Sequence, residues 1–225
     1  MLYEFCAENV ELVPAAIAAG AGRIELCDNL AVGGTTPSAG VISAAVSYAH
    51  EHAAQVMCMI RPRGGDFHYS QDELRIMEMD LALAISAGVD GIVLGCLKPH
   101  SGGWALDDLT LGSLVMSAAY AAEECKREPV QMTFHMAFDQ LSPEAQLDAI
   151  DTLAECGIAR ILTHGGPAGS RIEDNLEHLT QLIEYAGDRL KILPGGGITY
   201  ENRASIAQAL GVDELHGTRI VKLGD

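Results

Sequence analysis

The chain has 225 residues, of which 48% are hydrophobic and 20% charged, a composition typical of a globular protein with a substantial apolar core. Acidic residues outnumber basic ones by 31 to 14, so the formal net charge is -17. Because a surface of this sign is repelled by the phosphates of DNA and RNA, we expect no nucleic-acid partner.

The start of the chain and its cysteines indicate a cytoplasmic protein. Residues 2–6 include no basic segment followed by an apolar stretch, so we expect no secretory signal. The uncharged, largely apolar run from Leu109 to Ala122 is shorter than the roughly 20 residues that span a bilayer, so we expect no membrane partner. The six cysteines are widely spaced and form no CxxC pair, so free thiols are expected.

Apolar runs alternate with helical patterns along the chain. Strands are predicted at Leu2–Cys6, after Gly20, at Gln55–Ile60, after Gly88, at Val130–His135, after Gly157, at Lys191–Pro194 and at Asp213–His216. Four of these strands share one pattern, in which a glycine ends a helix and aliphatic residues three to five positions later begin the strand. This repetition predicts a fold built from related strand-helix units.

Helices are predicted between the strands. Apolar residues recur on one face most clearly in Asp72–Ser86 and in Asp174–Ala186. The segments that begin at Ser70 and Ser170 have the pattern of a capping box, and Ser142 precedes a proline at the first helical position.

Eight strands that alternate with helices predict a parallel (β/α)8 TIM barrel that forms a single domain over residues 1–225, with a doubly wound open sheet as the alternative. The repeat favours the closed barrel. Only Gly217–Asp225 follow the eighth strand, so the last outer helix is expected to be missing or replaced by a short tail. The outer faces of the last and first strands would then be exposed, and we expect a homo-oligomer, either a dimer or a tetramer, that covers this seam.

Alternation along each strand separates the side chains that face the helices from those that face the barrel interior. The predicted inward set is Glu4, Cys6, Glu25, Cys27, Met57, Met59, Arg61, Thr133, His135, Glu214 and His216. Buried charges are costly unless they are paired. The expected pairs join Arg61 or Arg63 to Glu4, Glu25 or Asp139. A structural salt-bridge network would account for this interior, but polar groups at the carboxyl ends of barrel strands are more typical of a ligand site.

An anion site is predicted from two loops. Gly195, Gly196 and Gly197 follow the seventh strand, where TIM barrels often hold a phosphate against backbone N–H groups. Arg61 and Arg63 follow the third strand and have forked donors that suit a phosphate or a carboxylate.

A set of acid-base groups is predicted at the same end of the barrel. Glu25, His135 and Asp139 are the candidate catalytic residues. His135 would transfer protons near neutral pH, and Asp139 or a glutamate would orient it.

Sulfur atoms offer a different interpretation of the interior. Cys6, Cys27 and Met59 face inward from three consecutive strands, and thiolate and thioether are soft ligands that favour Cu(I). Cys58 and Cys96 are expected to face the helices and pack as small apolar residues. The chain contains no HExxH or CxxC motif, so a zinc site is not expected.

Several strand ends and loops together resemble one protein family. They are Glu25–Asp28, Gly33–Ser38, Met59–Phe67, Thr133–His135, Ala137–Asp139 and Pro194–Ile198. This set, of which Ile60–Phe67 is the most specific part, resembles the CutC copper-homeostasis family over nearly the whole chain. The resemblance implies a (β/α)8 barrel, a cytoplasmic location, oligomers and Cu(I) binding through cysteine, with Cys27 as the cysteine that matches the family motif. It implies no established reaction.

Two positions depart from the pattern of that family. Met136 stands where an arginine is usual, which removes a positive charge beside His135. His164 stands where a serine is usual. Both side chains are potential soft or borderline metal ligands.

Two functions therefore remain open. One is a cytoplasmic copper-homeostasis protein that binds Cu(I) through Cys27, with Cys6 and Met59 as partners. The other is a TIM-barrel enzyme that acts on a small anionic or phosphorylated metabolite by acid-base chemistry at the barrel mouth. A purely structural or interaction barrel is the third alternative and ranks last, because polar groups at the strand ends are more typical of a ligand site.

Overall fold

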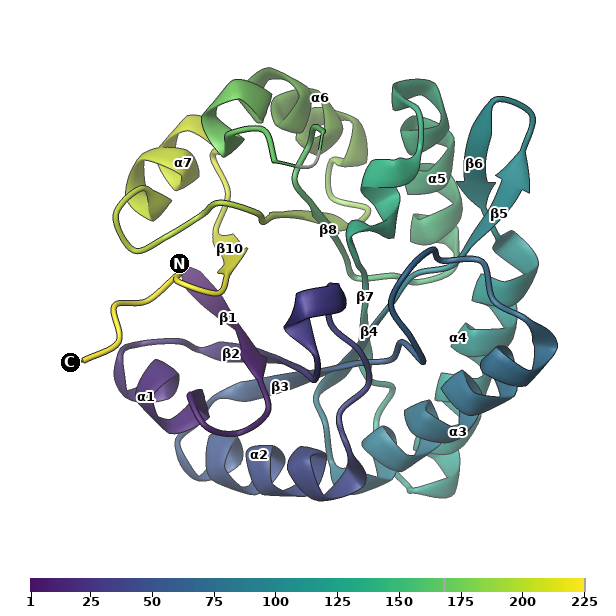
Figure 1. Ribbon diagram of the computed structural model, residues 1–225, viewed down its shortest axis with the longest axis vertical. Helices are drawn as coiled ribbons and strands as arrows, with labels where there is room; N and C mark the ends of the chain where they lie inside the picture. The colour runs from purple at the N-terminus through teal and green to yellow at the C-terminus, as the bar shows by residue number, and fades with distance from the viewer. Residues whose placement is uncertain (168, 225) are drawn as a thin grey trace.

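The computed structural model describes residues 1–167 and 169–224 and shows a parallel β-barrel surrounded by helices (Figure 1). The barrel strands are β1 (Leu2–Glu8), β2 (Arg23–Cys27), β3 (Gln55–Met59), β4 (Gly91–Leu94), β7 (Gln131–Phe134), β8 (Arg160–Thr163), β9 (Lys191–Pro194) and β10 (Glu214–Gly217). They form an eight-stranded sheet in the order β10-β1-β2-β3-β4-β7-β8-β9. The predicted (β/α)8 fold is confirmed.

The barrel closes between β9 and β10, the two end strands of the sheet. Each neighbouring pair in the sheet is joined by a parallel ladder, including β10 with β1. Beyond the ends of β9 and β10, Thr199 and Arg219 form an isolated parallel bridge, and the Tyr200 N–H donates to the Arg219 carbonyl at 2.8 Å. The loops that follow the last two strands are thereby tied to one another at the carboxyl end of the barrel.

Helices cover the outside of the barrel. They are α1 (Val13–Ala18), α2 (Ala39–Glu51), α3 (Gln71–Ala87), α4 (Asp108–Glu124), α5 (Pro143–Glu155), α6 (Leu176–Ala186) and α7 (Arg203–Leu210). Short 3-10 helices lie at Leu30–Val32, Met136–Gln140 and Ile172–Asn175, and β5 (Leu97–His100) forms a hairpin with β6 (Gly103–Leu106). Within the described part of the chain, no helix is both long and apolar enough to cross a membrane.

The predicted helix starts were mostly confirmed. Ser70 caps α3 in a complete capping box with Glu73, and the Ser142 hydroxyl accepts from the Ala145 N–H at the start of α5. The capping box predicted at Ser170 was wrong. A 3-10 turn precedes α6, so its N-cap is Asn175, and the Ser170 hydroxyl donates to the Pro167 carbonyl instead.

The chain runs as a short tail after β10, with no further helix in the described residues, as predicted. This tail covers the seam that the missing helix would have left exposed. Ile220 and Val221 are buried in the apolar core, and the Arg203 side chain donates to the Ile220 carbonyl at 2.7 Å. Arg203 also stacks over the Tyr3 ring. An exposed seam between the last and first strands is therefore not the reason to expect an oligomer.

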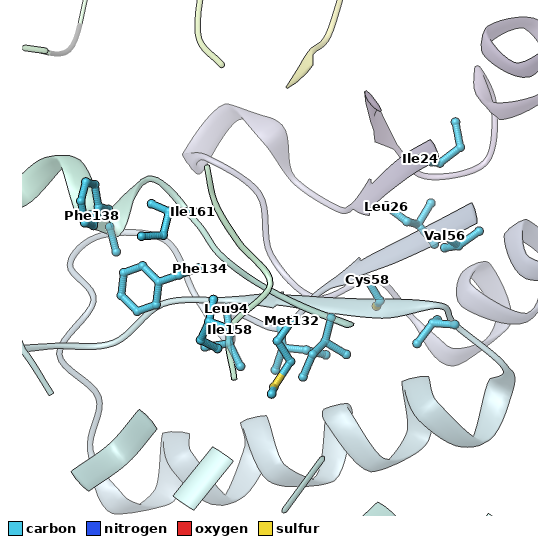
Figure 2. Close-up of a cluster of buried hydrophobic side chains, with 14 of the residues drawn as sticks. Ile24, Leu26, Val56, Cys58, Leu94, Met132, Phe134, Phe138, Ile158 and Ile161 are labelled. Atoms are coloured by element: carbon cyan, nitrogen blue, oxygen red, sulfur yellow. The ribbon is translucent and has the colours of Figure 1, made fainter. Parts of the chain in front are cut away.

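The apolar core lies between the strands and the helices, as Figure 2 shows for Leu26, Val56 and Phe134. Their side chains alternate with those that point into the barrel. Cys58 and Cys96 belong to this outer core and are buried, as predicted. The inward-facing residues are consequently left to form a separate, largely polar interior.

Candidate functional site

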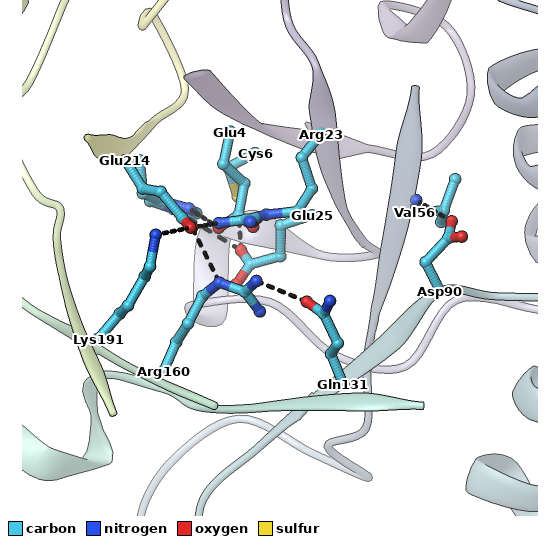
Figure 3. A network of polar contacts seen from close by, with 11 residues as sticks. Glu4, Cys6, Arg23, Glu25, Val56, Asp90, Gln131, Arg160, Lys191 and Glu214 are labelled. Atoms are coloured by element: carbon cyan, nitrogen blue, oxygen red, sulfur yellow. Dashed lines mark hydrogen bonds and ion pairs between the residues drawn. The ribbon is translucent and has the colours of Figure 1, made fainter. Parts of the chain in front are cut away.

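A network of buried charges fills the amino-terminal half of the barrel (Figure 3). Arg23 lies at its centre, where it donates through Nε to Glu4 and through Nη2 to Glu214 at 2.6 Å. The Glu214 carboxylate also accepts from Arg160 Nε at 2.9 Å and from Lys191 Nζ at 2.8 Å. Glu4 and Arg23 meet because they are partners in the β1-β2 register.

This network differs from the predicted pairing. Neither Arg61 nor Arg63 pairs with Glu4, Glu25 or Asp139, because both arginines lie in the loop beyond β3, whereas Arg23 lies within the barrel. The signal that identifies Arg23 was available in the sequence. It precedes Glu25 by two positions and therefore shares its inward orientation. Arg160 was missed in the same way, since it lies one position before the helix-facing Ile161.

Favourable charges keep the carboxylates of this network ionised. Burial alone would raise the pKa of Glu4, but its hydrogen bond with His216 and the charge of Arg23 lower it to about 2. Burial would also raise the pKa of Glu214, but the hydrogen bond from Lys191 and the charge of Arg23 lower it to about 2. The lower half of the barrel is therefore a set of paired charges rather than an open site.

Sulfur atoms gather above this network. Cys6, Cys27 and Met59 belong to one buried cluster with Met57 and Val93, and Leu30 packs against it. Both thiols lie near the same carboxylate oxygen, because Glu25 Oε2 is 3.2 Å from the Sγ of Cys6 and 3.6 Å from that of Cys27. The three ligand atoms of Cys6, Glu25 and Cys27 all lie within 4.8 Å of one another. The structure thus brings together the three predicted sulfur ligands.

Both thiols are free and are expected to be protonated at neutral pH. The hydrogen bond with Cys27, together with burial, raises the pKa of Cys6 well above 9.0. The same hydrogen bond lowers the pKa of Cys27, but burial and the charge of Glu25 raise it to about 11. Cys27 is fully buried, whereas Cys6 reaches the cavity described below. A ligand that enters from the cavity would therefore meet Cys6 first.

His216 lies between two glutamates beside the sulfur cluster. Its Nδ1 is 2.8 Å from Glu4 Oε1, and its Nε2 is 3.7 Å from Glu25 Oε2. Burial alone would lower the pKa of His216, but the charge of Glu25 and hydrogen bonds to neighbouring groups raise it well above 6.5. Burial also raises the pKa of Glu25. These two groups can hold and transfer a proton at the base of the cavity.

A cavity of about 310 Å³ opens at the carboxyl end of the barrel. The residues that carry its chemistry are Cys6, Glu25, Met59, Arg61, His135, Met136, Gly196, Gly197, His216 and Arg219. They come from the loops after β3, β7, β9 and β10 and from the inward faces of β1, β2, β3 and β10. This is the position at which TIM barrels bind their ligands.

His135 lines the cavity, but its surroundings differ from those predicted. Its Nδ1 accepts from the Ala137 N–H at 3.1 Å, and burial with the nearby charge of Arg61 lowers its pKa to about 3. The imidazole is therefore neutral and bears its proton on Nε2. Asp139 does not orient it. That carboxylate accepts from the Thr163 hydroxyl and from the His164 N–H at 3.0 Å, outside the cavity.

The two predicted anion-binding arginines occupy different environments. Arg61 is buried in the cavity wall, where its Nη atoms donate to the carbonyls of Val32, Gly34 and Gly65 at 3.0, 3.1 and 2.8 Å. Arg63 lies outside the cavity and forms ion pairs with Glu73 at 2.5 Å and with Asp66 at 3.0 Å. Only the first of the two can contact a ligand in the cavity.

The glycine turn and the last loop complete the rim. Gly196 and Gly197 both have φ of +80°, a conformation that favours glycine, and both line the cavity, whereas Gly195 is buried and does not line it. Arg219 was not predicted, since only the bridge between Thr199 and Arg219 places its loop there.

The two positions that depart from the family pattern also have different roles. Met136 lines the cavity. The His164 ring instead contacts the Gly195, Gly196 and Ser170 carbonyls at 3.0 to 3.2 Å. Of these two residues, only Met136 therefore faces the cavity.

Comparisons with known proteins agree with this architecture. The profile of the CutC family matches residues 1–221. A CutC family protein of Enterococcus faecalis is 56% identical over 221 residues, which cover 98% of this chain and all of the relative. A mouse protein named copper homeostasis protein cutC homolog is 39% identical over 215 residues, covering 96% of this chain and 72% of the relative. The crystal structure of a CutC protein from Streptococcus agalactiae superposes with a TM-score of 0.90 at 43% identity, covering 98% of this chain and all of the other. The chain therefore belongs to the CutC family.

Proposed function

We propose that the chain binds Cu(I) in copper homeostasis, with Cys6 and Cys27 as thiolate ligands and Met59 as a thioether ligand. The observation that carries the proposal is the arrangement of the two buried thiols around one Glu25 oxygen, in a cluster that includes Met59. Soft sulfur donors in a pocket with little access to water suit Cu(I) better than hard divalent ions. Membership of the CutC family supports the connection with copper.

Copper binding at this site must displace protons. Since the pKa of Cys27 is about 11, its thiol is neutral in the free protein, and a thiolate ligand forms only when the proton leaves. Affinity for Cu(I) should therefore rise with pH. Glu25 lies within 3.6 Å of both sulfurs and is placed to accept a proton from either thiol.

Competition with a chromophoric Cu(I) chelator under anaerobic conditions tests the proposal. We expect one Cu(I) per chain, and Cys27→Ser or Cys6→Ser should weaken binding by more than about tenfold. Cys125→Ser is the matched control, because Cys125 is exposed at the end of α4 and remote from the cluster. Equal Cu(I) affinity in the wild type and in all three variants would refute the sulfur site.

A second candidate function is proton-transfer catalysis on a small anionic metabolite. Glu25 and His216 favour it, because both line the cavity and lie 3.7 Å apart with raised pKa values. In this proposal they replace the predicted combination of His135 and Asp139 as the acid-base pair. Glu25→Gln should then abolish turnover of a metabolite that the cavity still binds, and unchanged turnover would exclude the pair.

We also propose a cytoplasmic location. All six cysteines are free thiols, which is the usual state in a reducing compartment. Fractionation of cells with an antibody against the chain tests this, and recovery outside the cytoplasm would contradict it.

A further inference from the structure

Two buried hydrogen-bond donors in the cavity wall have no partner within the described residues. Arg61 is 3% exposed, and although its Nη atoms bond to carbonyls, its Nε makes no hydrogen bond. His135 is 4% exposed, and its Nε2 is also unpartnered. Buried donors of this kind are rare in folded proteins, and these two remain able to donate to an acceptor that enters the cavity.

These two donors belong to one part of the wall. The Arg61 guanidinium lies 4.7 Å from the centre of the Phe67 ring, and the His135 ring lies 5.0 Å from the same centre. Both side chains are held from behind, Arg61 by three carbonyls and His135 by the Ala137 N–H. Their orientations are therefore set before a ligand arrives.

The glycine turn and Arg219 add further donors from the loops after β9 and β10. The N–H groups of Gly196 and Gly197 form no hydrogen bond within the part of the chain that the structure describes, and both residues line the cavity. Successive backbone N–H groups in such a turn form a concave site for anions. The Arg219 side chain makes no ion pair with any described residue.

The cavity wall has more basic than acidic side chains, whereas the chain as a whole is acidic. The chain has 31 acidic and 14 basic residues. Of the described residues that line the cavity, Glu25 is acidic, Arg61 and Arg219 are basic, and His216 is a further residue that can carry a positive charge. A cavity with this bias attracts anions even though the protein as a whole repels them.

We infer that the cavity binds the carboxylate or phosphate group of a small organic anion, held by the Nε of Arg61, the Nε2 of His135, the glycine turn and Arg219. The rest of the ligand would extend along the apolar side chains of Leu30, Met59 and Leu162 toward Glu25. A volume of about 310 Å³ limits it to the size of a small metabolite. The inference deepens the second candidate function and does not depend on copper.

Calorimetric titration of the copper-free full chain with inorganic phosphate, malonate and neutral glycerol tests the inference. We expect saturable binding of phosphate or malonate at one site and no binding of glycerol, and the stronger of the two anions identifies the group that the site prefers. Absence of saturable binding by both anions overturns the inference.

Substitution of single donors tests whether the anion binds in the cavity. Arg219→Gln and His135→Phe should each weaken binding of the anion by about tenfold or more, as expected when one donor to a charged group is lost. Arg63→Gln is the matched control, since it removes the same charge from an arginine outside the cavity. Equal weakening by Arg63→Gln and Arg219→Gln would show a general charge effect and overturn the inference. Because Arg219 is exposed, its variant remains informative if His135→Phe fails to fold.

The same titration separates this inference from the two proposed functions. Cys27→Ser should lose Cu(I) binding and retain anion binding, so failure of the copper site leaves the anion site standing. If the chain binds the anion but Glu25→Gln changes no turnover, the anion site stands and the proposed acid-base pair is excluded. Loss of anion binding in Cys27→Ser would contradict the assignment of the anion to donors that do not include the sulfur cluster.

Discussion

The Nδ1 of His216 lies 2.8 Å from Oε1 of Glu4, although 212 positions separate the two residues in the chain. They meet because β10 pairs with β1 and places them in register. The other oxygen of Glu4 accepts from Arg23. This one carboxylate therefore links the paired charges of the lower barrel to the imidazole that faces the sulfur cluster and the cavity.

The protonation states of the two cavity histidines should be opposite at pH 7. The pKa of His216 is raised well above 6.5, whereas that of His135 is lowered to about 3. We expect ¹⁵N spectra to show an imidazolium at His216 and a neutral ring with its proton on Nε2 at His135. Assignment through His216→Gln and His135→Phe identifies the signals, and two neutral rings would contradict the ionic role of Glu4.

Stability should fall in acid as Glu214 is protonated. Its pKa is about 2 in the folded chain and 4.5 as a free group, so the stabilisation is present above pH 4.5 and is lost as the pH falls toward 2. The difference corresponds to about 3 kcal/mol.

Urea denaturation at pH 7 and pH 3 measures this loss. Glu214→Gln leaves Arg160 without its carboxylate and Arg23 with Glu4 alone, and should destabilise the chain by about 3–5 kcal/mol at pH 7. The gap between the variant and the wild type should narrow at pH 3. A gap that does not depend on pH would show that the ion pairs do not supply the stabilisation.

Replacement of Met59 should weaken Cu(I) binding, whereas replacement of Met57 should not. Both belong to the sulfur cluster, but only Met59 lines the cavity. Replacement by leucine conserves volume and should cost less than about 1.5 kcal/mol of stability at either position. Met59→Leu should weaken Cu(I) binding severalfold, as measured by chelator competition, while Met57→Leu should not. The same affinity in both variants would remove Met59 from the proposed ligand set.

We propose that the chain forms a homo-oligomer through α3 and α4, where large apolar side chains are exposed. Met79 and Met116 are 67% and 74% exposed, and Tyr120 lies near Met116 on α4. Sedimentation velocity at micromolar concentration should show a dimer or tetramer, and Met116→Lys should shift it toward the monomer. Leu12→Lys is the control, because Leu12 is exposed at the start of α1, away from α3 and α4 (Figure 1), and a monomeric wild type would refute the proposal.

Local patterns were sufficient to predict the barrel and part of the site. Alternation along β1 and β2 placed Cys6, Glu25 and Cys27 inward, because a strand fixes the direction of every second side chain. The same rule applied to Arg23 would have predicted the central cation of the network. Ser70 signalled the start of α3 because capping is a contact between residues only a few positions apart.

Contacts between loops could not be predicted in this way. Arg61 and Arg63 are two positions apart in one loop, yet one lines the cavity and the other pairs with Glu73 on α3. Asp139 is only a few positions from His135 but bonds to the β8 strand end. Loop side chains have no periodic direction, so their partners are chosen by which strand ends meet when the barrel closes. Alternation in the sequence determined which side chains enter the barrel, and the tertiary structure alone decided which of them share the cavity.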